Sequence, residues 1–138
     1  MVNPDIRWKQ RFENYAKAVA LVEEALVNGA QALSQLEKEG LMQRFEYTVE
    51  LGWKTMKDFM AEGGLVLETL TPKAVVSAAW QAKLIPDGQV WVDMLVHRNM
   101  LSHRYDEAAV AEVASALENR YLAEFRALRD WFAARASQ

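Results

Sequence analysis

The chain has 138 residues, 16 of them Lys or Arg and 19 Asp or Glu, with a formal net charge of −3 and no cysteine. This length predicts a single domain over residues 1–138. The lack of cysteine excludes disulfides, thiolate metal sites and a cysteine nucleophile. The slightly acidic balance argues against broad, sequence-blind binding to nucleic acid, which normally needs a basic face.

The N-terminal residues Met1 to Trp8 contain no apolar core of a secretory signal. No apolar run approaches the roughly 18 residues that a transmembrane helix needs. We therefore expect a cytoplasmic protein without a membrane partner.

The first third of the chain has a helical pattern. Asn3 and Pro4 have the residue types of an N-cap and a first helical position. Apolar residues then recur at steps of four and three, which predicts one buried helix face. Asn28 and Gly29 indicate the end of this helix. The apolar positions are Trp8, Phe12, Tyr15, Val19, Val22 and Leu26.

The polar segment from Ala30 to Gly40 is predicted to be a short helical turn or a connector, and a second long helix is predicted from about Leu41 to Glu62. We expect Gly52 inside this helix to permit a close crossing with another element, since glycine otherwise costs a helix about 1 kcal/mol relative to alanine. Leu65 to Leu70 is apolar but has no strand to pair with, so it is predicted to be a loop over the core. The expected buried side comprises Phe45, Val49, Gly52, Trp53, Met56, Phe59 and Met60.

Three further helices follow. Thr71 and Pro72 open the first, whose expected apolar face is Val75, Val76, Ala79, Trp80 and Leu84. After a turn at residues 86–88, the next runs from about Gln89 to Leu101. The last begins near Asp106, a good N-cap, and carries an apolar stripe to Phe132. Together these segments predict an all-α, antiparallel up-and-down bundle of four or five helices.

Chemistry-bearing residues concentrate around the two histidines, His97 and His103. A neutral imidazole can move protons near pH 7, and an arginine guanidinium matches phosphate oxygens. An imidazole and a guanidinium together are sufficient for metal-independent RNA cleavage, in which the ribose 2′-oxygen attacks the phosphorus. They are equally sufficient for simple nucleotide binding. The neighbouring groups are Asp93, Arg98, Asn99, Ser102, Arg104, Tyr105 and Asp106.

Spacing constrains how these groups meet. Asp93 and His97 are four apart and share a helix face; a histidine beside an acid is also typical of a surface ion pair. Arg98 and His103 would point about 140° apart on an unbroken helix. They converge only if the helix ends near Leu101 or if two copies of the chain face one another. Two histidines six apart do not predict a metal site.

Rival signatures are missing from the sequence. There is no glycine-rich phosphate loop, and no Gly-Ser nucleotidyltransferase motif with paired aspartates. We therefore expect that the chain does not transfer nucleotides by itself, and that it uses no cofactor.

The pattern Arg98-Asn99-x-x-x-His103-x-Tyr105 resembles the signature of the HEPN superfamily. The runs Arg44–Lys54 and Asp87–Leu95 add a resemblance to the nucleotidyltransferase substrate-binding protein family, and the likeness extends from about Trp8 to Trp131. This resemblance implies a HEPN-like helical bundle that forms a homodimer. It also implies a separate, small nucleotidyltransferase partner encoded nearby, which carries the catalysis while the bundle binds the substrate.

Close relatives in the HEPN superfamily act as toxins that cleave RNA, with the nucleotidyltransferase as antitoxin. On that alternative, the resemblance implies that Arg98 and His103 are the catalytic pair and that Asn99 supports them. Tyr105 would be a target for adenylylation. For the binding function, a nucleotide or RNA is the expected ligand, and the candidate binding residues are Arg98, Asn99, His103, Tyr105, Asp93 and His97.

Overall fold

The structure is a computed structural model that describes residues 4–137, so the predicted N-cap at Asn3 lies outside the described residues. Within them there is no strand, and the prediction of an all-α protein is confirmed. In chain order the elements are α1 (Pro4–Ala25), η1 (Ala30–Ala32), α2 (Gln35–Glu62), α3 (Pro72–Gln81), α4 (Gly88–Leu101), α5 (Glu107–Ala116), η2 (Leu117–Tyr121) and α6 (Leu122–Ala136).

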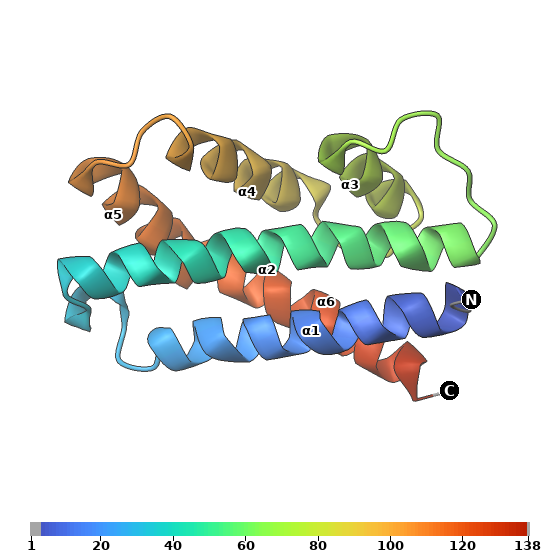
Figure 1. Ribbon diagram of the computed structural model, residues 1–138, viewed down its shortest axis with the longest axis horizontal. Helices are drawn as coiled ribbons and strands as arrows, with labels where there is room; N and C mark the ends of the chain where they lie inside the picture. Colours follow the sequence, from blue (N-terminus) through green and yellow to red (C-terminus); the bar gives the residue numbers. More distant parts are fainter. Residues whose placement is uncertain (1–3, 138) are drawn as a thin grey trace.

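The helices form an antiparallel bundle in which the long α2 is central (Figure 1). α1 runs alongside α2 in the opposite direction, and α6 packs on α1 from behind. α3 and α4 lie over the opposite side of α2, and α5 leads back into α6. The start of α1 and the end of α6 lie at the same end of the bundle. None of the described helices is both long and apolar enough to cross a membrane.

The apolar helix faces meet in one core whose largest fully buried members are aromatic. Gly52 of α2 faces the Trp91 ring of α4, and a Cβ atom there would lie 2.7 Å from that ring. The predicted close approach at Gly52 is therefore confirmed, and it lets α4 pack directly on the α2 backbone. The fully buried aromatic side chains are Tyr15, Phe45, Trp91, Tyr121, Phe125 and Phe132.

The start of α2 corrects the sequence prediction. The helix begins at Gln35 rather than near Leu41, because Ser34 and Glu37 form a capping box. The Ser34 hydroxyl accepts from the Glu37 N–H at 3.1 Å, and the Glu37 carboxylate accepts from the Ser34 N–H at 2.8 Å. This arrangement satisfies two N–H groups that a helix start leaves without partners. In the first turns of α2, Leu36 is 80% exposed. These turns have no apolar stripe from which the start of the helix could have been predicted.

Trp80 was predicted to belong to the buried face of α3, and this was wrong. The side chain is 46% exposed. Its ring lies over Gly88 at the start of α4, where a Cβ atom would overlap it. The tryptophan therefore covers a backbone junction between α3 and α4 instead of filling the core.

The last predicted helix is interrupted by a π-helical turn, η2, between α5 and α6. Its apolar stripe continues through the turn, with Leu117 and Tyr121 both buried, so the sequence pattern did not predict the interruption. Single π-helical turns inside α-helices commonly occur at functional sites. Here the turn carries Arg120 and Tyr121, both of which bond to side chains of α4.

Candidate functional site

Arg98 occupies the last turn of α4 and is held against α2. Its Nη1 donates to the Glu50 Oε2 at 2.9 Å, and its Nη2 donates to the Asn99 Oδ1 at 3.4 Å. The Arg98 side chain is 24% exposed. A guanidinium has more N–H donors than these two contacts use. Arg98 is therefore oriented by the protein while it keeps donors for a ligand.

Two carboxylates of α2 that lie near Arg98 differ in their pKa. Burial raises the pKa of Glu46, although the positive charge of Arg98 opposes the shift. Burial also acts to raise the pKa of Glu50, but hydrogen bonds from Trp53 and Lys54 and the charge of Arg98 outweigh it, so this pKa lies below its ordinary value. Glu50 is thus the firmly ionised partner of Arg98.

α4 ends at Leu101, as predicted, and the turn that follows is tightly bonded. The Ser102 hydroxyl donates to the Asn99 carbonyl at 2.6 Å. The His103 backbone N–H donates to the Met100 carbonyl at 3.0 Å. The His103 imidazole itself is exposed, and within residues 4–137 it makes no hydrogen bond or ion pair. This imidazole is accessible to a ligand or to another chain.

The rest of the turn leads into α5. Arg104 forms an ion pair with Asp106 at 3.2 Å. Asp106 also caps α5 by accepting from the Ala109 N–H at 2.8 Å. Both contacts are local to the turn, so the role of Arg104 is to stabilise the start of α5.

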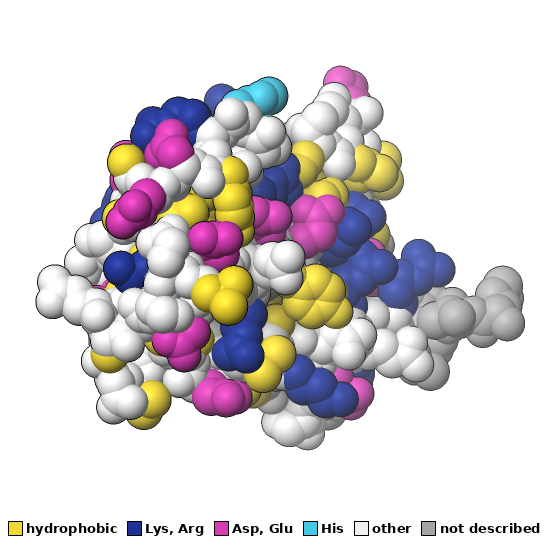
Figure 2. Space-filling view, turned by 60° about the vertical axis from the view of Figure 1, so that its left-hand side comes forward, with side chains coloured by type: hydrophobic (Ala, Val, Ile, Leu, Met, Phe, Trp, Pro, Cys, Tyr) yellow, Lys and Arg dark blue, Asp and Glu magenta, His cyan; other side chains and the backbone are white. Residues whose placement is uncertain are grey.

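Tyr105 lies across the surface of α2. Its hydroxyl donates to the Glu39 carbonyl at 3.1 Å, and the side chain is 46% exposed. Burial and the nearby carboxylates of Glu46 and Glu39 raise the pKa of Tyr105, which keeps the phenol protonated. Figure 2 shows acidic and basic side chains interspersed on this end of the bundle, with apolar side chains between them.

His97 points away from this surface, toward α5 and η2. Its Nε2 lies 2.9 Å from a Glu112 carboxylate oxygen, and its Nδ1 lies 2.7 Å from the Tyr121 hydroxyl. Burial raises the pKa of Tyr121 to about 12. The phenol is protonated and can donate to Nδ1 in the tautomer that carries its proton on Nε2, where the N–H donates to Glu112. The acid that pairs with His97 is thus Glu112, not the sequence neighbour Asp93.

Asp93 lies on the same side of α4 as His97, as the spacing predicted. It accepts from Arg120 of η2 at 2.8 Å and from Gln89 at 2.9 Å. The hydrogen bonds from Arg120 and Gln89 lower the pKa of Asp93. Asp93 and His97 together fasten α4 to the π-helical turn.

The structure therefore divides the six candidate residues. Arg98, Asn99, His103 and Tyr105 lie at the C-terminal end of α4 and the turn after it, whereas Asp93 and His97 are engaged on another face. No hydrogen bond links Arg98 with His103 within the described part of the chain. Nor does that part contain a group of three or more His, Asp or Glu side chains that could hold a metal ion.

Sequence reasoning missed two residues, one that contacts Arg98 and one that lines the same cavity. One is Glu50, which lies inside the run Arg44–Lys54 and was not singled out there. The other is Lys73 at the start of α3, for which the sequence carried no signal. Lys73 and Arg98 line one cavity of about 300 Å³ between α3 and α4, together with Thr71, Pro72, Val92, Leu95, Val96 and Asn99.

The fold defines the class of protein as an all-α antiparallel helical bundle. Residues 10–133 match the family described as "nucleotidyltransferase substrate binding protein like", and the chain belongs to this family. No curated protein matches it significantly.

A similar fold is seen in the crystal structure of a protein from Thermus thermophilus. The TM-score is 0.70 and the two chains are 27% identical, over 90% of this chain and 99% of the Thermus chain. The likeness covers nearly the whole of both chains, so the bundle described above is shared as a complete unit.

Proposed function

We propose that this protein is the non-catalytic substrate-binding subunit of a two-component minimal nucleotidyltransferase system. The catalytic component would be a separate small nucleotidyltransferase encoded nearby. Membership of the family supports a role beside a nucleotidyltransferase. The observation that carries the proposal is the state of Arg98, which Glu50 holds in place while donors remain for a ligand.

An arginine fixed in this way suits an anionic substrate. Its orientation is set before binding, so little side-chain freedom is lost when a phosphate arrives. Asn99 is exposed beside it and offers both a donor and an acceptor. His103 and Tyr105 extend the same helix end with an imidazole and an aromatic ring. The protein would therefore hold the substrate while the partner performs the transfer.

Co-expression with the neighbouring nucleotidyltransferase tests this function. We expect the two proteins to co-purify, and the bundle to lower the KM of the partner for its substrate. Arg98→Ala should remove the effect on KM. Arg126→Ala is the matched control, because Arg126 pairs with Glu23 on another face and Arg129 stays to bind that carboxylate. A partner whose kinetics are identical with and without the bundle would rule out the proposal.

A second function, a metal-independent ribonuclease neutralised by the nucleotidyltransferase, is favoured by the exposed and unengaged imidazole of His103. In that reaction His103 would accept the proton of a ribose 2′-hydroxyl as the 2′-oxygen attacks phosphorus. The P–O5′ bond would break as the 2′-O–P bond forms, and the 5′-oxygen would take a proton from solvent water, so the product carries a 2′,3′-cyclic phosphate. Arg98 would stabilise the charge on the phosphoryl oxygens. Two chains facing one another would bring both copies of this turn together.

Incubation with RNA in the absence of divalent metal separates the two functions. The ribonuclease function predicts cyclic phosphate ends that disappear in His103→Ala, while Arg104→Ala, altered in the same turn, keeps its activity. Intact RNA with the unaltered protein leaves only the binding function. Light scattering would show whether the chain forms the expected homodimer.

Modification of Tyr105 is tested by mass spectrometry after mixing with the partner and ATP. The Tyr105 ring is accessible, but its hydroxyl is bonded to Glu39, so adenylylation would have to break that contact. An added AMP on Tyr105, absent from Tyr105→Phe, is the expected result if the partner acts as antitoxin.

A further inference from the structure

The cavity between α3 and α4 has an apolar floor and a cationic rim. Leu95 is buried, Val92 is partly buried, and Val96 is 59% exposed at the mouth. Lys73 and Arg98 contribute the rim charges. Lys73 is exposed and makes no ion pair within the described residues. The cavity volume of about 300 Å³ lies at the small end of the range for ligand sites, roughly 300–1,000 Å³.

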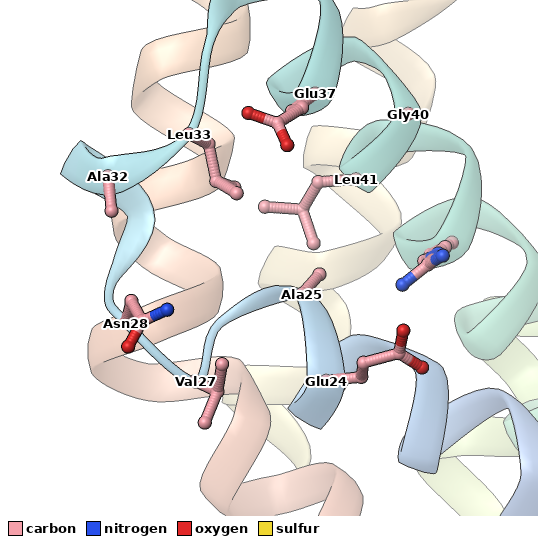
Figure 3. A pocket seen from close by; sticks show the side chains of 10 residues that line it. Glu24, Ala25, Val27, Asn28, Ala32, Leu33, Glu37, Gly40 and Leu41 are labelled. Carbon is pink, nitrogen blue, oxygen red and sulfur yellow. The ribbon is translucent and has the colours of Figure 1, made fainter.

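Its lack of carboxylates distinguishes this cavity from three other hollows on the described part of the chain, in which cations and carboxylates occur together or a carboxylate occurs alone. The hollow between the end of α1 and the start of α2 is lined by Glu24 and Glu37, on opposite sides of it (Figure 3). Two more hollows include Glu118 or Glu39. The α3–α4 cavity has two cations and no carboxylate in its lining, although the whole chain is acidic. The lining residues by themselves favour an anion, and Glu50 on α2, which pairs with Arg98 at 2.9 Å, offsets part of that positive charge, so Lys73 is the cation without an ion-pair partner among the described residues.

We propose that this cavity binds a nucleoside phosphate, with the phosphate between Lys73 and Arg98. The base and sugar would cover Val92, Leu95 and Val96. The inference rests on the proposed substrate-binding function and names the substrate class and the position of the ligand. It adds Lys73 and Val96 to the site, and it places the ligand on the α3 side of Arg98, away from His103 and Tyr105.

The structure around Arg98 suits this role. Arg98 lines the cavity, and its guanidinium is oriented by Glu50 on α2. Thr71 uses its hydroxyl to cap α3 by accepting from the Ala74 N–H at 3.2 Å, which fixes the start of the helix that carries Lys73. Lys73 of α3 and Arg98 of α4 thus line the same cavity, and a phosphate bound by both would bridge the two helices.

Binding of AMP, measured by calorimetry on the whole chain, tests the proposal. Lys73→Glu should weaken AMP binding at least about tenfold, because it replaces a charge-assisted contact by repulsion. Val96→Asp should weaken it comparably by placing a carboxylate at the mouth. Neither change threatens folding, since both side chains are exposed and an acid is favourable in the first turn of a helix.

Matched controls lie on other faces of the bundle. Lys17→Glu changes a lysine of α1, and Val27→Asp changes a valine that is 76% exposed. Both should bind AMP as the unaltered protein does. Adenosine without a phosphate should bind more weakly than AMP. If Lys73→Glu and Val96→Asp bind AMP with unchanged affinity, the cavity is not the site and the proposal is wrong.

The source of the nucleoside phosphate is distinguished with a short adenylate RNA. Dependence on Lys73 for AMP alone identifies a free nucleotide, and the same dependence for both probes identifies the end of an RNA strand. An unaltered protein that binds neither probe overturns this inference, even if it docks the nucleotidyltransferase and the proposed function stands. Conversely, if AMP binding depends on Lys73 but the protein does not dock the nucleotidyltransferase, the cavity is confirmed as a nucleotide site and the proposal of a two-component system is wrong.

Discussion

The two histidines of the chain lie six positions apart but occupy opposite kinds of environment. The His97 imidazole uses both nitrogens, one with Tyr121 and one with Glu112. The His103 imidazole is exposed and has no partner within residues 4–137. The first is part of the contact between α4 and the π-helical turn, whereas the second is free for chemistry. Proximity in the chain therefore does not make the two histidines members of one site.

The largest expected difference between the two regions concerns their tyrosines. Tyr121 is fully buried and stacks on Phe45 with ring centroids 5.7 Å apart. Tyr121→Ala should lower the free energy of unfolding by about 3–5 kcal/mol, as for other buried aromatic truncations. Tyr105→Ala should cost about 1 kcal/mol or less, because the residue is 46% exposed and makes one hydrogen bond. Urea denaturation followed by circular dichroism measures both values.

Similar losses for the two tyrosine variants would contradict the division into a structural and a surface region. A Tyr105→Ala protein that is folded yet unable to dock the nucleotidyltransferase would strengthen this division, because docking would then be lost while the free energy of unfolding stayed the same.

The histidines themselves should show a smaller but similar contrast. His97→Ala leaves the buried Tyr121 hydroxyl without its partner, which should cost about 1–3 kcal/mol. His103→Ala should change stability by less than about 0.5 kcal/mol, as for surface substitutions that break no contact. Differential scanning calorimetry at neutral pH would detect the difference. A destabilised His103→Ala would mean that the imidazole has a structural role in the folded chain.

The smallest expected effect distinguishes the two carboxylates near Arg98. The folded-state pKa of Glu50 is lowered, so its carboxylate stabilises the fold above the ordinary glutamate pKa. That stabilisation is lost as pH falls through the folded-state pKa. Glu50→Gln should therefore cost less than about 1 kcal/mol at neutral pH, since a side chain that is 38% exposed is screened by solvent.

Glu46→Gln should have the opposite sign, because the pKa of Glu46 is raised by burial and its ionised form is disfavoured in the folded state. The variant should gain a few tenths of a kcal/mol at neutral pH. Both differences should vanish at a pH below the folded-state pKa of Glu50. Unfolding free energies measured across this pH range check the signs, and equal signs for the two variants would show that the assignment of the Arg98 partner is wrong.

Much of the fold was predictable because helical signals are local. The cap at Asp106, the end of α4 at Leu101 and the first-turn Pro72 were all read correctly from neighbouring residues. The start of α2 was missed even though Ser34 and Glu37 have the spacing of a capping box. There the apolar pattern was given more weight than the cap, and the exposed early turns of α2 lack such a pattern.

The candidate site was only partly predictable. The motif residues Arg98, Asn99, His103 and Tyr105 were named from their types and spacing, and the break in the helix between them was expected. The partner of Arg98 was not, because Glu50 lies 48 positions away in the chain. Lys73 was missed for the same reason, since only the packing of α3 on α4 brings it into the same cavity lining as Arg98.

The sequence by itself determined the helical class and most helix ends, because a helix repeats every few residues and its caps act within one turn. The tertiary structure decided which histidine is engaged, what holds Arg98 and where a cavity forms. Those outcomes depend on how helices that are distant in the chain pack together. The period of apolar residues within one helix does not say which other helix its buried face will contact.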